Sequence, residues 1–155
     1  QSIMKLSDNE KSILRNKKLG FVFQFHELLP EFTAIENVCL PSWISKNNID
    51  KTREEAVKIL DEFDLLKVAN KKPDEMSGGE RQRVSVARSL INNPKIVFAD
   101  EPSGNLDSEN SKNLYSLFYE LRKHKGCSFV IVTHDLKFAN MSDRKIVLND
   151  GKIIK

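Results

Sequence analysis

The chain has 155 residues, 39% of them hydrophobic and 30% charged, which are the proportions of an ordinary globular protein with a buried core. Its 25 basic and 22 acidic residues leave a net charge of only +3, too small and too scattered to favour a nucleic-acid partner. The longest apolar run, residues 129–132, cannot cross a bilayer, and Cys39 and Cys127 lack metal-ligand spacing, so two reduced, buried thiols are expected.

The elements expected in the first half of the chain begin with a strand and continue with helices. Residues 19–25 have the composition of a buried strand. Thr33 and Glu36 have the spacing of a capping box and predict a short helix that ends around residues 41–45. A second helix is expected over residues 52–64. Its apolar face consists of Ala56, Val57, Leu60 and Phe63.

The second half alternates between helices and strands, which favours an α/β fold. A third helix is expected from Ser77 to about residue 91. Residues 96–99 and 129–132 are continuous apolar runs, typical of strands buried on both faces of a parallel sheet. Between them, the pattern predicts a helix over residues 108–125 that ends at Gly126.

The chain is expected to close with a hairpin over residues 145–154 that turns at residues 149–151. Because the helices between Thr33 and the end of the third helix follow one another without a strand, they predict a helical subdomain inserted into an α/β core. The whole chain, residues 1–155, is then one partial domain. Its subdomain covers about residues 26–92, and its core covers residues 17–25 and 93–155.

The strongest local signal is the sequence M-S-G-G-E-R-Q-R over residues 76–83. Ser77 and Glu80 form a second capping-box pattern, and Gly78 and Gly79 let a phosphate approach the bare N–H groups of a helix N-terminus. An ordinary helix cap is the alternative for the S-x-x-E spacing alone. The two glycines and the basic residues after them favour a phosphate site.

Polar side chains also follow each expected strand. The strand over residues 96–99 ends at Asp100 and Glu101, which places two carboxylates where open α/β sheets bind ligands. Asp100 suits Mg²⁺ beside nucleotide phosphates, and Glu101 suits a general base, although an acidic turn is the alternative. His134 follows the strand over residues 129–132, and Gln24 stands at the end of the strand over residues 19–25; each alone would be an ordinary packed or strand-terminal residue.

In this order, the motifs resemble those of ABC-type ATPases along the whole chain. Gln24 stands at the Q-loop of that family, residues 77–81 at its signature motif and residues 96–101 at its Walker B strand. Residues 103–107, S-G-N-L-D, match the D-loop, and His134 matches the switch histidine.

The resemblance extends to a subfamily. Residues 25–38, F-H-E-L-L-P-E-F-T-A-I-E-N-V, look like the ATPases that power lipoprotein release from the bacterial inner membrane. Macrolide-exporter and cell-division ATPases are near relatives. The gap between Gln24 and Ser77 is too short for the coiled-coil insertion of DNA-repair ATPases, which disfavours a non-transport ATPase. Intact Glu101 and His134 disfavour a non-enzymatic interaction module.

Two features depart from the family pattern. Glu80 stands where the wider family usually has Gln, and we interpret it as a mark of the lipoprotein-release branch. The phosphate-loop pattern G-x-x-x-x-G-K-[ST] (Walker A) does not occur in these residues. We therefore expect a P-loop NTPase-like core, mostly parallel, that lacks the N-terminal strands and this loop. These 155 residues alone are expected neither to bind ATP tightly nor to hydrolyse it.

The resemblance implies a homodimer in which ATP lies between two subunits. Ser77, Gly78, Gly79 and Glu80 would then bind the ATP held mainly by the partner subunit. Asp100 and Gln24 would organise Mg²⁺, while Glu101, His134 and Gln24 would be catalytic. Asp107 would communicate across the dimer. Integral membrane permease subunits would dock beside Gln24, including residues 25–30, at the cytoplasmic face of the bacterial inner membrane.

Overall fold

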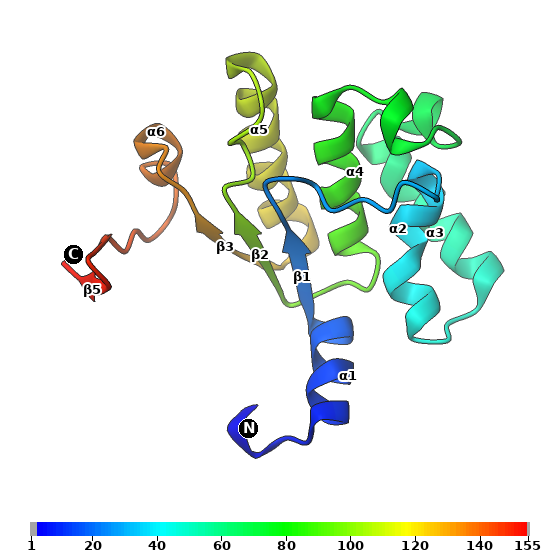
Figure 1. Ribbon diagram of the computed structural model, residues 1–155, viewed down its shortest axis with the longest axis horizontal. Helices are drawn as coiled ribbons and strands as arrows, with labels where there is room; N and C mark the ends of the chain where they lie inside the picture. The colour runs from blue at the N-terminus through cyan, green and yellow to red at the C-terminus, as the bar shows by residue number, and fades with distance from the viewer. Residues whose placement is uncertain (1–2, 155) are drawn as a thin grey trace.

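Three short parallel strands lie at the centre of the molecule, and the computed structural model describes residues 3–154 (Figure 1). They are β1 (Leu19–Val22), β2 (Ile96–Asp100) and β3 (Ser128–Val132), with β2 in the middle. Phe98 of β2 pairs with Phe21 of β1 and with Val130 of β3. Since all three strands run in the same direction, their carboxyl ends share one edge of the sheet. The predicted α/β fold with a parallel sheet is confirmed.

Three helices that follow β1 pack together beside the sheet. They are α2 (Ala34–Ile44), α3 (Ile49–Glu62) and α4 (Gly78–Leu90), with the 3₁₀ turns η2 (Leu66–Val68) and η3 (Pro73–Glu75) between α3 and α4. The predicted capping box starts α2: the Thr33 amide donates to Glu36 Oε2 at 2.8 Å, and the Glu36 amide donates to Thr33 Oγ1 at 3.4 Å. The predicted start of α3 at residue 52 is wrong, because Asn48 caps that helix.

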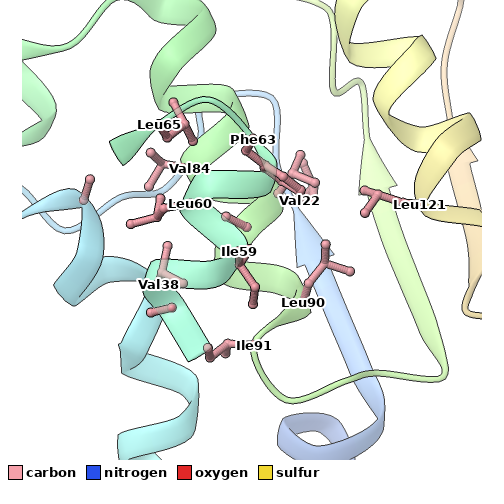
Figure 2. Close-up of a cluster of buried hydrophobic side chains, with 14 of the residues drawn as sticks. Val22, Val38, Ile59, Leu60, Phe63, Leu65, Val84, Leu90, Ile91 and Leu121 are labelled. Atoms are coloured by element: carbon pink, nitrogen blue, oxygen red, sulfur yellow. The ribbon is translucent and has the colours of Figure 1, made fainter. Parts of the chain in front are cut away.

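The buried apolar cluster joins α3 and α4 to β1 and α2 and continues to β2 and α5. Figure 2 shows Leu60 of α3, Val84 of α4 and Val38 of α2 gathered in it, all completely buried. Val57 was expected on this face of α3 but is 40% exposed. The buried face of α3 is formed by Thr52, Ala56, Ile59 and Leu60, so Val57 lies beside this face and not on it.

Among residues 3–154, only one face of the sheet is covered, so the prediction of strands buried on both faces is wrong for these residues. Val97 and Ala99 point to the face that α4 approaches, and they are at most 2% exposed. Phe21 and Phe98 point to the opposite face, where each is 37% exposed and their rings stack with centroids 5.8 Å apart. That face stays open in the part of the chain that the structure describes, so an apolar run alone does not tell how many faces of a strand are covered.

The remaining elements either follow β2 or precede β1 in the chain. The predicted helix α5 (Ser108–Lys125) is confirmed, and Gly126 ends it with a left-handed φ of 62°. After it come α6 (Leu136–Ala139) and a hairpin of β4 (Leu148–Asn149) and β5 (Lys152–Ile153), shorter than predicted, whose turn residues both have positive φ.

The turn η1 (Ile3–Lys5) and helix α1 (Asp8–Lys18) precede β1 and were not predicted, although Ser7 and Glu10 have capping-box spacing. Between residues 3 and 154 there is no helix with the length and apolar character needed to span a membrane.

Two variants of α3 test this packing. We expect Leu60→Ala to lower the free energy of unfolding by about 3 kcal/mol, because it leaves a cavity at a completely buried position. Val57→Ala, on the exposed side of the same helix, should change it by less than about 0.5 kcal/mol. Denaturant unfolding followed by the fluorescence of Trp43, the one tryptophan in the sequence, measures both. Equal losses would contradict the orientation of α3.

Candidate functional site

Glu101 follows β2 directly and begins the loop at the shared edge of the sheet. Its φ of 41° lies in the left-handed region, which a residue with a side chain rarely adopts. Two main-chain hydrogen bonds support this conformation: the Glu101 amide donates to Val132 O at 2.9 Å, and the Gly104 amide donates to Glu101 O at 3.0 Å. The end of β3 therefore determines where the Glu101 side chain starts.

The Glu101 carboxylate binds the segment that follows β3. Its Oε1 accepts a hydrogen bond from the His134 amide at 2.9 Å and lies 2.8 Å from His134 Nδ1. Its Oε2 accepts from Thr133 Oγ1 at 3.3 Å. An ionised carboxylate only accepts hydrogen bonds, so a neutral imidazole that bonds to it through Nδ1 carries its proton there and keeps Nε2 as an acceptor. The His134 side chain is 82% exposed and that of Glu101 22%, so a shielded carboxylate orients an accessible imidazole.

Asp100, the last residue of β2, lies opposite Val132 of β3 and is exposed. It shares the open face of the sheet with Phe98, two residues earlier on the same strand. Within residues 3–154, no group of three His, Cys, Asp or Glu side chains is arranged to hold a metal ion. One exposed carboxylate fits the way Mg²⁺ is commonly bound, by one or two carboxylates together with substrate phosphates and water.

Gln24 lies against the loop that Glu101 begins. Asn105 Nδ2 donates to the Gln24 carbonyl at 3.0 Å. A Cβ atom placed on Gly104 would be only 2.7 Å from Gln24 Nε2, so Gly104 allows the amide of Gln24 to reach this loop. The structure thus brings Gln24, two residues after the end of β1, to residues 104–105 of the loop after β2.

The N-terminus of α4 forms a second cluster with the N-terminus of α5. The Ser77 amide donates to Glu80 Oε2 at 2.9 Å, and the Glu80 amide donates to Ser77 Oγ at 3.3 Å, which confirms the predicted capping box. The hydrogen bond from the Ser77 amide, and less strongly that from the Ser77 hydroxyl, holds the pKa of Glu80 below its usual value. Gly79 packs against α5, since a Cβ there would lie 2.5 Å from Asn110 Oδ1.

The loop over residues 101–107 joins the two clusters. It starts at Glu101 beside His134 and ends at Asp107, which caps α5 and also accepts a hydrogen bond from Asn110 Nδ2 at 2.8 Å. Among the described residues, no hydrogen bond connects Ser77 with Glu101 or His134. The structure therefore gathers candidate residues into two groups, one at each end of this loop.

Two residues near these groups were missed in the sequence. Arg88 of α4, largely buried, donates to the main-chain oxygens of His26 (2.8 Å) and Glu27, whose φ angles of 65° and 48° are both left-handed. A charged residue within the apolar stripe of α4 is a signal that could have indicated it. Tyr115 of α5 contacts both Ser103 and Asp135 through its hydroxyl group. Nothing local indicates this, because Tyr115 simply adjoins the apolar stripe of α5.

Comparisons with known proteins find relatives that cover nearly the whole chain. The ABC transporter family matches residues 3–104. The lipoprotein-releasing system ATP-binding protein LolD of Cytophaga hutchinsonii is 53% identical over 154 residues, which cover 99% of this chain and 70% of that protein. LolD of Bacteroides fragilis is 51% identical over 153 residues, which cover 99% of this chain and 71% of that protein.

Two solved structures resemble the fold closely. A dimeric structure of a post-hydrolysis state of the ATP-binding cassette MJ0796 bound to ADP and Pi has a TM-score of 0.85 and 40% identity, covering 97% of this chain and 67% of its own. A dimeric structure of MJ0796, a bacterial ABC transporter cassette, has a TM-score of 0.86 and 40% identity, covering 99% and 68%.

The cap of α5 generates a pH-dependent prediction. Hydrogen bonds, first that from the Asn110 amide, hold the pKa of Asp107 below its usual value. Since the folded pKa is the lower one, the carboxylate stabilises the fold above the unfolded pKa, and this is lost as the pH falls through the folded pKa. We expect Asp107→Asn to flatten the fall in Tm from about pH 5 to about pH 2. Asp61→Asn, at an exposed position on α3, is the control, and parallel curves for all three proteins would contradict the prediction.

Proposed function

The chain belongs to the ABC transporter family, and on that premise we propose that it is the ATP-binding subunit of a transporter that releases lipoproteins. As the full-length protein, it hydrolyses ATP to drive its membrane partners. The observation that carries this proposal is the pairing of Glu101 with His134 at the carboxyl edge of the sheet. The identity to LolD proteins supports lipoprotein release over macrolide export or cell division.

The proposed site is completed by a second copy of the protein. Ser77, Gly78 and Gly79 present the positive end of α4, and the ATP held mainly by the partner subunit would bind there. Glu80 keeps Ser77 in its capping conformation. Asp107, in the loop between the two groups of site residues, would contact the partner subunit and communicate its approach. The two solved relatives are dimers, which supports this arrangement.

Asp100 and Gln24 would hold Mg²⁺ together with the phosphates of ATP. The ion would neutralise charge that develops on the phosphates during their transfer. The chain's own contribution is to place a carboxylate at the end of β2 and an amide against the loop at residues 104–105.

Glu101 is the proposed general base. It takes a proton from a water molecule as the water oxygen attacks the γ-phosphorus and the bond to the β–γ bridging oxygen breaks, leaving ADP and phosphate. Glu101 also keeps the proton of a neutral His134 on Nδ1, so that Nε2, once protonated, can donate to the γ-phosphate.

The proposed membrane partner docks on the helical part of the chain, which we take as residues 26–92. Beside Gln24, the side chains of Phe25 and Leu29 are 71% and 44% exposed and offer an apolar surface to a permease helix. Arg88 holds this segment in place by donating hydrogen bonds to the main-chain oxygens of residues 26 and 27. The protein would then lie at the cytoplasmic face of the bacterial inner membrane.

Glu101→Gln in the full-length protein with its membrane subunits tests the proposal. We expect ATP hydrolysis to fall by about 100-fold or more, with ATP binding retained, because the amide cannot accept the proton. Glu120→Gln, an exposed change on α5, should leave the rate unchanged. Hydrolysis by Glu101→Gln at the wild-type rate would refute the role of Glu101. Robust hydrolysis without release of lipoproteins from membrane vesicles would refute the proposed cargo.

A further inference from the structure

One hydroxyl group connects the loop after β2 with the loop after β3. Tyr115 Oη lies 2.7 Å from Ser103 Oγ and 2.8 Å from Asp135 Oδ2. Ser103 stands two residues after Glu101, and Asp135 stands directly after His134. The tyrosine belongs to neither loop, since it projects from α5. Its hydroxyl group can therefore couple the position of one loop to the position of the other.

The direction of these hydrogen bonds follows from the groups involved. An ionised carboxylate only accepts, so Tyr115 donates its single proton to Asp135, and Ser103 must donate to Tyr115. The pKa directions agree with this: burial raises the pKa of Tyr115, and the tyrosine hydroxyl is the first cause of the lowered pKa of Asp135. Bonds that point the same way along a chain polarise and strengthen one another.

The chain of hydrogen bonds returns to Glu101 and closes a ring. The Asp135 amide donates to Thr133 Oγ1 at 3.0 Å, and Thr133 Oγ1 donates to Glu101 Oε2 at 3.3 Å. The covalent chain from Glu101 to Ser103 completes the ring. His134 lies between Thr133 and Asp135 in the chain. The closed circuit of hydrogen bonds through Tyr115 therefore holds the residue that contacts Glu101 Oε1.

The aromatic ring of Tyr115 is held by packing, so the position of its hydroxyl group is well defined. It stacks on Phe138 of α6 with centroids 3.7 Å apart and planes 14° apart, and the side chain is buried. Asp135 also caps α6 through Oδ1, which accepts from the Lys137 and Phe138 amides. Because the Tyr115 side chain is held in place, a shift of Ser103 would move α6 and the segment around His134.

We propose that Tyr115 is a positioning residue that couples residues 101–107 to residues 133–135, so that Glu101 and His134 hold their paired geometry only while Ser103 is in place. This inference rests on the proposed function. Asp107 lies in the same loop as Ser103, so the approach of a second copy would reach His134 through Tyr115. The hydroxyl, rather than the ring, carries this coupling.

Tyr115→Phe in the full-length transporter complex tests the inference, with Tyr119→Phe one turn later on α5 as the matched control. Tyr119 is 43% exposed, and its ring faces Arg122 and Lys123. We expect Tyr115→Phe to lower kcat for ATP about tenfold with KM unchanged, because the ring still packs while the pairing of Glu101 and His134 loosens. Tyr119→Phe should match the wild type. Equal kcat values for the two variants would overturn the inference.

Hydrogen exchange at the His134 amide gives a readout that does not depend on turnover. That amide donates to Glu101, so it should exchange faster in Tyr115→Phe than in wild type and Tyr119→Phe. Unchanged exchange would overturn the inference even if kcat fell. If the wild type hydrolysed no ATP, the proposed function would fail, and the exchange rates would still decide whether Tyr115 positions His134.

A double variant separates coupling from two independent effects. Ser103→Ala removes the group that donates to Tyr115, so Ser103→Ala combined with Tyr115→Phe should lower kcat no further than Tyr115→Phe alone. Losses that multiply would mean that the two residues act separately, and the inference would be wrong.

Discussion

The parallel pairing of β2 with β3 is the constraint on which the candidate site depends. It places Asp100 opposite Val132, so the residues that follow each strand leave the sheet side by side. The Glu101 amide then continues the pairing by one bond to Val132 O, in a left-handed conformation that turns the carboxylate toward Thr133 and His134. Without this register, a carboxylate and an imidazole 33 positions apart in the sequence would not meet.

Close approaches at glycine attach the other segments to this edge. Gly104 lets Gln24 reach the loop after β2, and Gly79 lets the tip of α4 touch Asn110 at the start of α5. In both cases a Cβ atom would meet the side chain of the neighbouring segment. The spacing of the segments within each group of site residues is therefore set by the absence of side chains as much as by attractive contacts.

Partly buried hydrogen bonds hold the loops of the site together, although several of its side chains are exposed. His134 and Asp100 are exposed, yet Glu101, Thr133, Tyr115 and Asp135 join the two loops beneath them through hydrogen bonds. Arg88 similarly ties α4 to the strained segment after Gln24. The proposed reacting groups thus stay accessible to a substrate while hydrogen bonds hold the loops that carry them, an arrangement that would preorganise charge for reaction.

The sequence by itself determined the features that arise between near neighbours, together with the family. The capping boxes at Thr33 and Ser77 and the glycine stop of α5 were predictable because each involves side chains and amides within about four residues. The motif order also indicated the ABC ATPase family. Only the tertiary structure decided which strand faces are covered, that Glu101 binds His134, and that Tyr115 and Arg88 reach across to distant loops. Those contacts join residues 20 to 62 positions apart, and no local pattern encodes such a distance.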